Sequence, residues 1–276
     1  MRVIVFLLLL ASLCHAGAQR IVSTAPSITE ILFAMGLGSR VAGVTNYCNY
    51  PPEVLKLPKI GTFLKPDVEV IVALHPDLVV VEKIPNHLPE QLTHLHVRYV
   101  QFESLNFETI YAGTREIGKA ADANAAAERF IRDMQSGLQD VRKRVSVLSK
   151  PTVAFLVGRV GNRLEGLIAG AAHSYFADLI DIAGGTNIFS DSSAPYSNVS
   201  LEEILSRNPD VILELSGERG EKQKETVRLW KEYPSLRAVA NGRVYPIPPG
   251  PFLIPGPRAV EAVRILAHLL HPDLRL

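Results

Sequence analysis

The segments Val70-Ile-Val-Ala-Leu-His-Pro-Asp-Leu-Val-Val80 and Ile204-Leu-Ser-Arg-Asn-Pro-Asp-Val-Ile-Leu213 decide the fold, because they place one pattern in each half of the chain. In both, an apolar helical turn is followed by a Pro-Asp pair and then by an apolar run. Proline ends the helix because it pushes the preceding residue out of the helical region, and the aspartate can close the turn through its own side chain. An unbroken apolar strand is typical of a parallel sheet that is buried on both faces. The repeat therefore predicts two similar lobes.

Outward from these segments, the first lobe is predicted over residues 19–105 and the second over residues 150–276. In the first lobe, Ser27 is placed to cap a helix that begins before Thr29, with Glu30 as the third residue after the cap. Residues 106–149 have another pattern, in which apolar side chains recur every three or four positions. This spacing predicts a long connecting helix at the back of the protein. The fold class is therefore α/β, with two Rossmann-like lobes, central parallel-type sheets and a cleft suited to a small ligand.

Residues 1–18 have the layout of a secretory signal peptide, with Arg2 before an apolar run and Ala16-Gly17-Ala18 as a small-x-small cleavage site. The apolar run is too short for a permanent transmembrane helix. We therefore expect cleavage after Ala18 and a soluble periplasmic protein. A lipid anchor at Cys14 is the less favoured alternative, because a leucine precedes it where lipoprotein signals carry a small residue.

Charge and composition exclude several classes of protein. Without residues 1–18 the chain carries 28 Lys and Arg against 28 Asp and Glu, so electrostatics give it no reason to bind nucleic acid. Cys48 then has no partner for an internal disulfide. The motifs of serine hydrolases, zinc proteases, phosphate loops and dinucleotide-binding folds are missing from the sequence. We therefore expect a binding protein, with a periplasmic enzyme on the same fold as the alternative.

An ordered set of segments resembles the helical-backbone periplasmic binding proteins, which serve ABC importers for cobalamin, iron-siderophores and haem. The segments include Ser23-Thr-Ala-Pro-Ser-Ile-Thr-Glu, Val41-Ala-Gly-Val-Thr, Tyr50-Pro-Pro-Glu, Leu57-Pro-Lys-Ile-Gly, Ala183-Gly-Gly-Thr-Asn-Ile-Phe and Pro257-Arg258. Tyr50-Pro-Pro-Glu and Ala194-Pro-Tyr196 are most similar to the cobalamin-binding branch. The resemblance implies a monomer without a resident metal or cofactor, which captures a corrinoid or a related metal chelate and delivers it to an ABC importer permease.

The resemblance also implies which residues form the ligand site. By position they are Pro26, Ser27, Phe63, Lys83, Tyr196, Phe252 and Arg258. The cobalamin-binding branch places tryptophan at several of these positions, whereas the single tryptophan here, Trp230, lies outside them. One glutamate per lobe is implied to dock on the permease, Glu90 in the first lobe and Glu221 or its neighbour Glu225 in the second.

Haem and ferric siderophores remain alternative ligands. A tyrosinate can ligate haem iron, and Tyr47, Tyr50 and Tyr196 are candidates by position. An anionic siderophore needs cationic groups, which Arg159, Arg163 and Arg258 could supply.

Three histidines form a loose group in the first lobe. His94 and His96 would face one side only if they lay on a strand, and a metal site there would also need further ligands near His87. The simpler interpretation is that they are exposed polar residues at the end of a helix, so no metal site is predicted.

Overall fold

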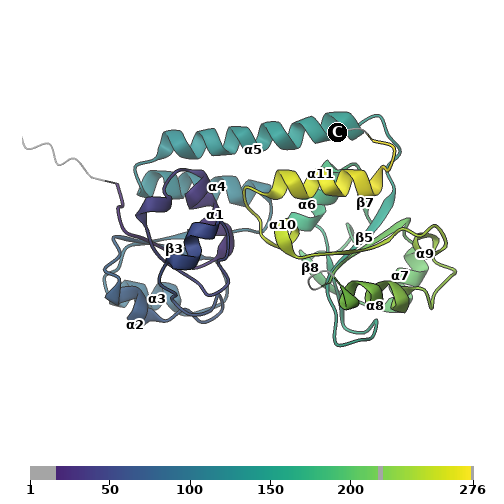
Figure 1. The fold of residues 1–276 in the computed structure, drawn as a ribbon, viewed down its shortest axis with the longest axis horizontal. Coiled ribbons are helices and arrows are strands. Elements are labelled where there is room, and N and C mark those ends of the chain that lie inside the picture. The colour runs from purple at the N-terminus through teal and green to yellow at the C-terminus, as the bar shows by residue number, and fades with distance from the viewer. Residues whose placement is uncertain (1–16, 217–219, 275–276) are drawn as a thin grey trace, which may run out of the picture.

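Two α/β lobes lie side by side beneath a long helix in the computed structural model, which describes residues 17–216 and 220–274 (Figure 1). The two-lobed α/β class predicted from the repeat is confirmed. Most of the predicted signal peptide, including Cys14, lies outside the described residues. No helix among the described residues has the length and apolar character needed to cross a membrane.

The first lobe contains a parallel sheet with the strand order β2-β1-β3-β4. Its strands are β1 (Ile21–Ser23), β2 (Val41–Val44), β3 (Leu78–Glu82) and β4 (Tyr99–Phe102), and its helices are α1 (Pro26–Ala34), η1 (Gly38–Arg40), η2 (Pro52–Lys56), α2 (Val68–Ala73) and α3 (Leu88–His94). Because side chains alternate along a strand, Leu78 and Val80 pack on the α1 side of the sheet. Val79 and Val81 pack on the side of α2 and α3. Burial on both faces accounts for the unbroken apolar run.

The second lobe contains a mixed sheet with the order β10-β9-β5-β6-β8. Its strands are β5 (Thr152–Gly158), β6 (Leu167–Gly170), β7 (Thr186–Asn187), β8 (Tyr196–Val199), β9 (Val211–Leu215) and β10 (Val244–Ile247), and its helices are α6 (Tyr175–Ile182), α7 (Leu201–Arg207), α8 (Glu221–Trp230), α9 (Arg237–Ala240), α10 (Gly250–Leu253) and α11 (Ala259–Leu270). The pairs β5–β9 and β9–β10 are parallel, whereas β5–β6 and β6–β8 are antiparallel. Only the parallel strands β10, β9 and β5 therefore repeat the arrangement of the first lobe.

The aspartate of each Pro-Asp pair holds two strands together. Asp77 accepts hydrogen bonds from the backbone N–H groups of Gln19 and Arg20, at 2.7 and 2.9 Å, next to the start of β1. Asp210 likewise accepts one from the N–H of Thr152 at the start of β5, at 2.9 Å. The sequence predicts that these aspartates close their own turns, but their carboxylates bind residues that are distant in the sequence. They satisfy backbone donors of the neighbouring strand instead.

The connecting segment consists of two helices, α4 (Phe107–Ala120) and α5 (Asn124–Val145), and not of one helix over 106–149. The chain turns between them, where Asp122 has a left-handed φ of 50°. The helix α4 begins next to the second lobe, where the N–H of Phe107 donates to Asp178 at 2.9 Å. It ends next to the first lobe, and α5 then crosses back to the second. The buried side of α5 consists of the periodic apolar residues Ala127, Phe130, Ile131, Met134, Leu138, Val141 and Val145.

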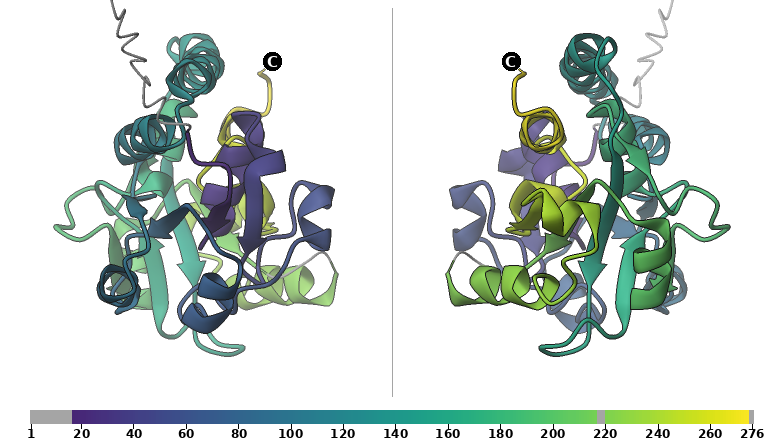
Figure 2. Two further views of the ribbon diagram at one scale, coloured as in Figure 1. Left: turned by 90° about the vertical axis from the view of Figure 1, so that its left-hand side faces the viewer. Right: turned by 90° about the vertical axis from the view of Figure 1, so that its right-hand side faces the viewer.

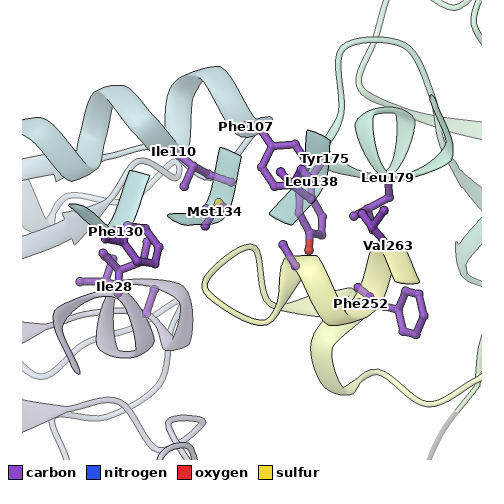
Figure 3. Packing of buried hydrophobic residues seen from close by; sticks show 14 of the residues in the cluster. Ile28, Phe107, Ile110, Phe130, Met134, Leu138, Tyr175, Leu179, Phe252 and Val263 are labelled. Carbon is purple, nitrogen blue, oxygen red and sulfur yellow. The ribbon is translucent and has the colours of Figure 1, made fainter. Parts of the chain in front are cut away.

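One hydrophobic core runs through both lobes beneath these helices. Ile28 of the first lobe and Leu179 and Val263 of the second belong to the same buried cluster. Phe130, Met134 and other residues of α4 and α5 fill the space between them (Figure 3). Seen from either end, α5 and α11 lie on one side of the sheets and α8 on the other (Figure 2). The lobes are therefore packed together on the α5 side.

Candidate functional site

The strand order places a crevice at the carboxyl edge of the first sheet. β1 and β3 are neighbours, but the chain leaves β1 through α1 toward β2 and leaves β3 through α3 toward β4. Loops that diverge in this way open a crevice in which α/β proteins bind ligands. The residues that follow these two strand ends are Pro26 and Ser27 after β1 and Lys83 after β3, with Glu82 as the last residue of β3. In the second lobe, the neighbouring ends of β5 and β9 carry Arg159 and Ser216.

Glu82 is a buried carboxylate in this crevice that sequence reasoning did not single out. Its exposed fraction is 5%. The N–H and Oγ of Ser104 donate to Oε1 at 3.1 and 2.6 Å, and Ser27 Oγ donates to Oε2 at 3.4 Å. Ser27 therefore does not cap α1 as predicted. The helix begins with Pro26, whose fixed φ suits a first helical position, and no side chain caps it.

The electrostatics of Glu82 follow from this burial. Desolvation raises the pKa of Glu82 from its ordinary 4.5 to about 7, although the hydrogen bonds from Ser104 and Ser27 lower it. Lys83, next in the chain, pairs with Glu103 at 3.1 Å. Burial also raises the pKa of Tyr196 in the second lobe, and the Glu82 carboxylate raises it further.

A second group of residues joins the lobes directly. Arg258, before α11, donates from Nε and Nη2 to the two carboxylate oxygens of Glu30 on α1, at 2.9 and 2.5 Å. The guanidinium also lies over the ring of Tyr50, 4.6 Å from its centroid. Burial raises the pKa of Glu30, while its hydrogen bond and ion pair with Arg258 lower it. Arg258, predicted as a ligand contact, is thus bound bidentately to the other lobe.

The second lobe has a buried glutamate of its own. Glu214, near the end of β9, accepts hydrogen bonds from Arg159 Nε at 2.7 Å and Trp230 Nε1 at 2.8 Å. Trp230 is fully buried in the cluster on the α8 side of the sheet. Both Glu82 and Glu214 follow an apolar strand run, and an acid at that position is the sequence signal that could have revealed them.

The structure separates the other predicted ligand residues into two groups. Pro26, Phe63 and Tyr196 keep accessible surface, and Tyr196 is 45% exposed with its ring against Phe176. Phe252 is only 1% exposed and packs on Phe155. Its ring turns inward on the short helix α10, so the structure shows it as a packing residue, and its role as a ligand contact stays a prediction.

The two predicted docking glutamates lie in the first turns of α3 and α8. Glu90 and Glu221 are both exposed. Their helices lie on the side of the molecule away from α5, one in each lobe (Figure 1). This arrangement is compatible with a partner that contacts both lobes at once. Their role remains a prediction.

The histidine group does not form a metal site in the structure. His94 ends α3 and His96 follows it in a left-handed conformation, with φ 54°. Among residues 17–216 and 220–274, no group of three or more His, Cys, Asp or Glu side chains is arranged to hold a metal ion.

Three surface hollows lie away from the facing loops of the lobes. One of about 530 Å³ is bordered by the β6 and β8 ends and by Leu229 and Tyr233 of the second lobe. The others, about 330 and 450 Å³, flank α5. We do not assign them to the ligand, because none includes the carboxyl ends of the central strands, where the topology places the crevice.

Comparison with known proteins agrees with this architecture. The profile of the periplasmic binding protein family matches residues 21–251. A vitamin B12-binding protein of Vibrio cholerae is 30% identical over 251 residues, covering 89% of this chain and 87% of that protein. An uncharacterized ABC transporter substrate-binding lipoprotein of Bacillus subtilis is 29% identical over 260 residues, covering 92% and 81%.

Solved structures show the same relationship. The periplasmic vitamin B12-binding protein of Vibrio cholerae superposes with a TM-score of 0.78 at 26% identity, covering 92% of this chain and 96% of that one. A periplasmic haem-binding protein from Roseiflexus, in its apo form, gives 0.77 at 25% identity, covering 93% and 99%. The chain therefore belongs to the periplasmic binding protein family, as a substrate-binding protein of the type that works with ABC importers.

Proposed function

We propose that this protein captures a corrinoid between its lobes and delivers it to an ABC importer permease in the periplasm, without changing it chemically. The similarity to vitamin B12-binding proteins supports the ligand class. Corrin rings are broad and apolar on their faces, and such faces pack well on aromatic and proline side chains. Phe63, Tyr196 and Pro26 offer such surfaces.

The pairing of the candidate arginines is the observation that carries the proposal. Arg258 is bound to Glu30 and Arg159 to Glu214. Arg163 lies 3.6 Å from the carboxylate of Glu165. An anionic chelate gains affinity from cationic groups that are free to pair with it. Arginines that already have carboxylate partners favour a ligand without strong negative charge, as a corrinoid is.

Calorimetric titration of the purified chain with cyanocobalamin and dicyanocobinamide tests the ligand. We expect a dissociation constant below about 1 μM, which corresponds to at least about 8 kcal/mol of binding free energy. Calorimetry suits this protein better than tryptophan fluorescence, because Trp230 is buried in the second lobe. Intact corrinoid recovered after incubation would argue against an enzyme.

Titration with hemin provides the opposing outcome. In this outcome neither corrinoid binds, and hemin binding shifts the Soret band. If one Tyr→Phe replacement at Tyr47, Tyr50 or Tyr196 removes that shift, the ligand is haem and not a corrinoid. The burial that raises the pKa of Tyr196 makes tyrosinate formation costly at that position unless iron binds there.

Charge reversal tests delivery to the permease. Glu90→Lys together with Glu221→Lys should abolish uptake in cells and leave corrinoid affinity unchanged, because complementary charge steers and orients docking. The control is Glu116→Lys on α4, where Glu116 is exposed and paired with Lys119. Uptake that survives the double reversal would refute the docking assignment.

A further inference from the structure

Glu82 is a buried acid that has no ion pair with a cationic side chain among residues 17–216 and 220–274. Its two oxygens are used unequally: Oε1 accepts hydrogen bonds of 3.1 and 2.6 Å from Ser104, whereas in the described part of the chain Oε2 accepts a single long one, 3.4 Å, from Ser27. The neighbouring Lys83 forms its ion pair with Glu103 and not with Glu82. A buried carboxylate is normally paired because leaving it unpaired is costly. Such costs are characteristic of functional sites.

The surroundings of Glu82 are those of a binding group. It lies at the carboxyl end of a central strand, at the switch in strand order where this type of sheet binds ligands. Tyr196 belongs to β8 of the other lobe; its partial burial raises its pKa, and the Glu82 carboxylate raises it further. The hydroxyls of Ser27 and Ser104 hold the carboxylate in place, so that Oε2 keeps lone pairs for another donor.

We propose that Glu82 determines the specificity of the site, by accepting a hydrogen bond from an amide group of the ligand and by repelling ligands that present carboxylates there. This inference rests on the proposed corrinoid function. Corrinoids carry amide groups around the ring, whereas haem carries two carboxylates. At a site of low dielectric, a fixed negative charge accepts an amide N–H strongly and disfavours a second negative charge.

Two variants separate the two roles of the carboxylate. Glu82→Gln keeps the size and one acceptor oxygen but removes the charge, and Glu82→Ala removes both. All affinities are measured by calorimetry on the full mature chain at pH 8, for dicyanocobinamide and for hemin. Far-ultraviolet circular dichroism and a thermal melt confirm that each variant is folded. Glu116→Gln on α4 is the control for an equal change in net charge away from the site.

We expect Glu82→Ala to weaken dicyanocobinamide binding at least tenfold, the range for a lost hydrogen bond to a charged group. Glu82→Gln should weaken it less and should strengthen hemin binding about tenfold, because the repulsion between carboxylates is removed. Glu116→Gln should change neither affinity.

The outcomes distinguish this inference from the proposed function. If the wild-type protein binds dicyanocobinamide and neither Glu82 variant changes either affinity, the inference is wrong and the corrinoid function stands. If the wild-type protein binds only hemin, the corrinoid function is wrong. In that case Glu82→Gln still tests the charge repulsion, and an unchanged hemin affinity overturns the inference as well.

Discussion

At the scale of single residues, three buried glutamates are stabilised in different ways. Glu30 is held by Arg258, and Glu214 by Arg159 and Trp230. Glu82 relies on hydroxyl and backbone donors alone among the hydrogen bonds of the described residues. Removing one partner of a buried ion pair leaves an uncompensated charge, whereas a carboxylate without a cation can become protonated. The two arrangements therefore predict different responses to mutation and to pH.

Glu82 should make the stability of the protein depend on pH. Its pKa in the folded state, about 7, lies above its ordinary 4.5, so the folded protein binds the proton more tightly than the unfolded chain does. This contribution to stability is complete below pH 4.5 and is lost as the pH rises through 7. The total is about 3 kcal/mol. Glu82→Gln should abolish this dependence.

Urea unfolding at pH 5 and pH 8 measures the effect. The free energy of unfolding of the wild type should fall between these pH values relative to that of Glu82→Gln. Glu116→Gln, on the exposed side of α4, should follow the wild type. Parallel stability curves for Glu82→Gln and wild type would show that Glu82 does not titrate in this range.

The pair Glu30–Arg258 should contribute to stability as a unit. Glu30→Ala leaves the guanidinium of Arg258 without its partner, so we expect a loss of about 3 kcal/mol in the free energy of unfolding. Replacing both residues by methionine should restore most of it, since a hydrophobic pair of similar volume avoids the desolvation cost.

The exposed pair between Arg115 and Glu128 is the matched control for this prediction. Both side chains are more than two-fifths exposed, and Glu128→Ala should cost no more than about 1 kcal/mol. Equal losses for Glu30→Ala and Glu128→Ala would contradict a special role of the inter-lobe pair.

At the scale of secondary structure, close packing of α5 on α11 holds the connecting helix in place. Gly137 is a point of close approach, because a Cβ built there would lie 2.8 Å from Cγ1 of Val260 on α11. Valine is stiff about its first side-chain torsion, so it has little freedom to move aside. A glycine inside a helix is otherwise unfavourable, and packing accounts for this one.

A larger side chain at Gly137 should force the two helices apart. Gly137→Leu is expected to reduce the free energy of unfolding by about 1–3 kcal/mol, the usual cost of overpacking. Ser136→Leu places the same side chain on the exposed face of α5, where we expect a change within about 0.5 kcal/mol. Urea denaturation of both variants compares them directly, and similar values would refute tight packing at this position.

At the scale of the whole molecule, the lobes share a core and an ion pair, and these features restrict hinge motion. The cluster under α4, α5 and α11 includes buried residues from both sheets, such as Val80 and Phe155. Separating the lobes would expose this apolar surface to water, which is unfavourable. Recognition is therefore expected to occur with little change in the angle between the lobes.

Spin labels on the two lobes test this expectation. Gln91→Cys on α3 and Lys222→Cys on α8 provide exposed attachment sites, while the native Cys48 is buried. The distance between the labels should change by less than about 2 Å when dicyanocobinamide binds. A larger shift, or a second distance in the free protein, would indicate a hinge. The control is the parent protein without the two introduced cysteines, in which the buried Cys48 should stay unlabelled.

The sequence by itself determined the features that arise from local periodicity. The Pro-Asp repeat predicts the two lobes. The spacing of apolar residues predicts every buried position of α5, because the apolar side of an amphipathic helix is the side that packs against the core. The break between α4 and α5 escaped this reasoning. The residues around Asp122 carry no proline, and only the return of the chain between the lobes requires a turn there.

Only the tertiary structure decided what the site residues contact. Ser27 meets Glu82 across 55 residues of sequence, and Arg258 meets Glu30 across 228. Position in a loop made Phe252 a candidate ligand contact, yet its ring is buried. Whether a side chain pairs, packs inward or stays free depends on which distant groups the fold brings beside it, because burial and electrostatic interactions act through space and not along the chain.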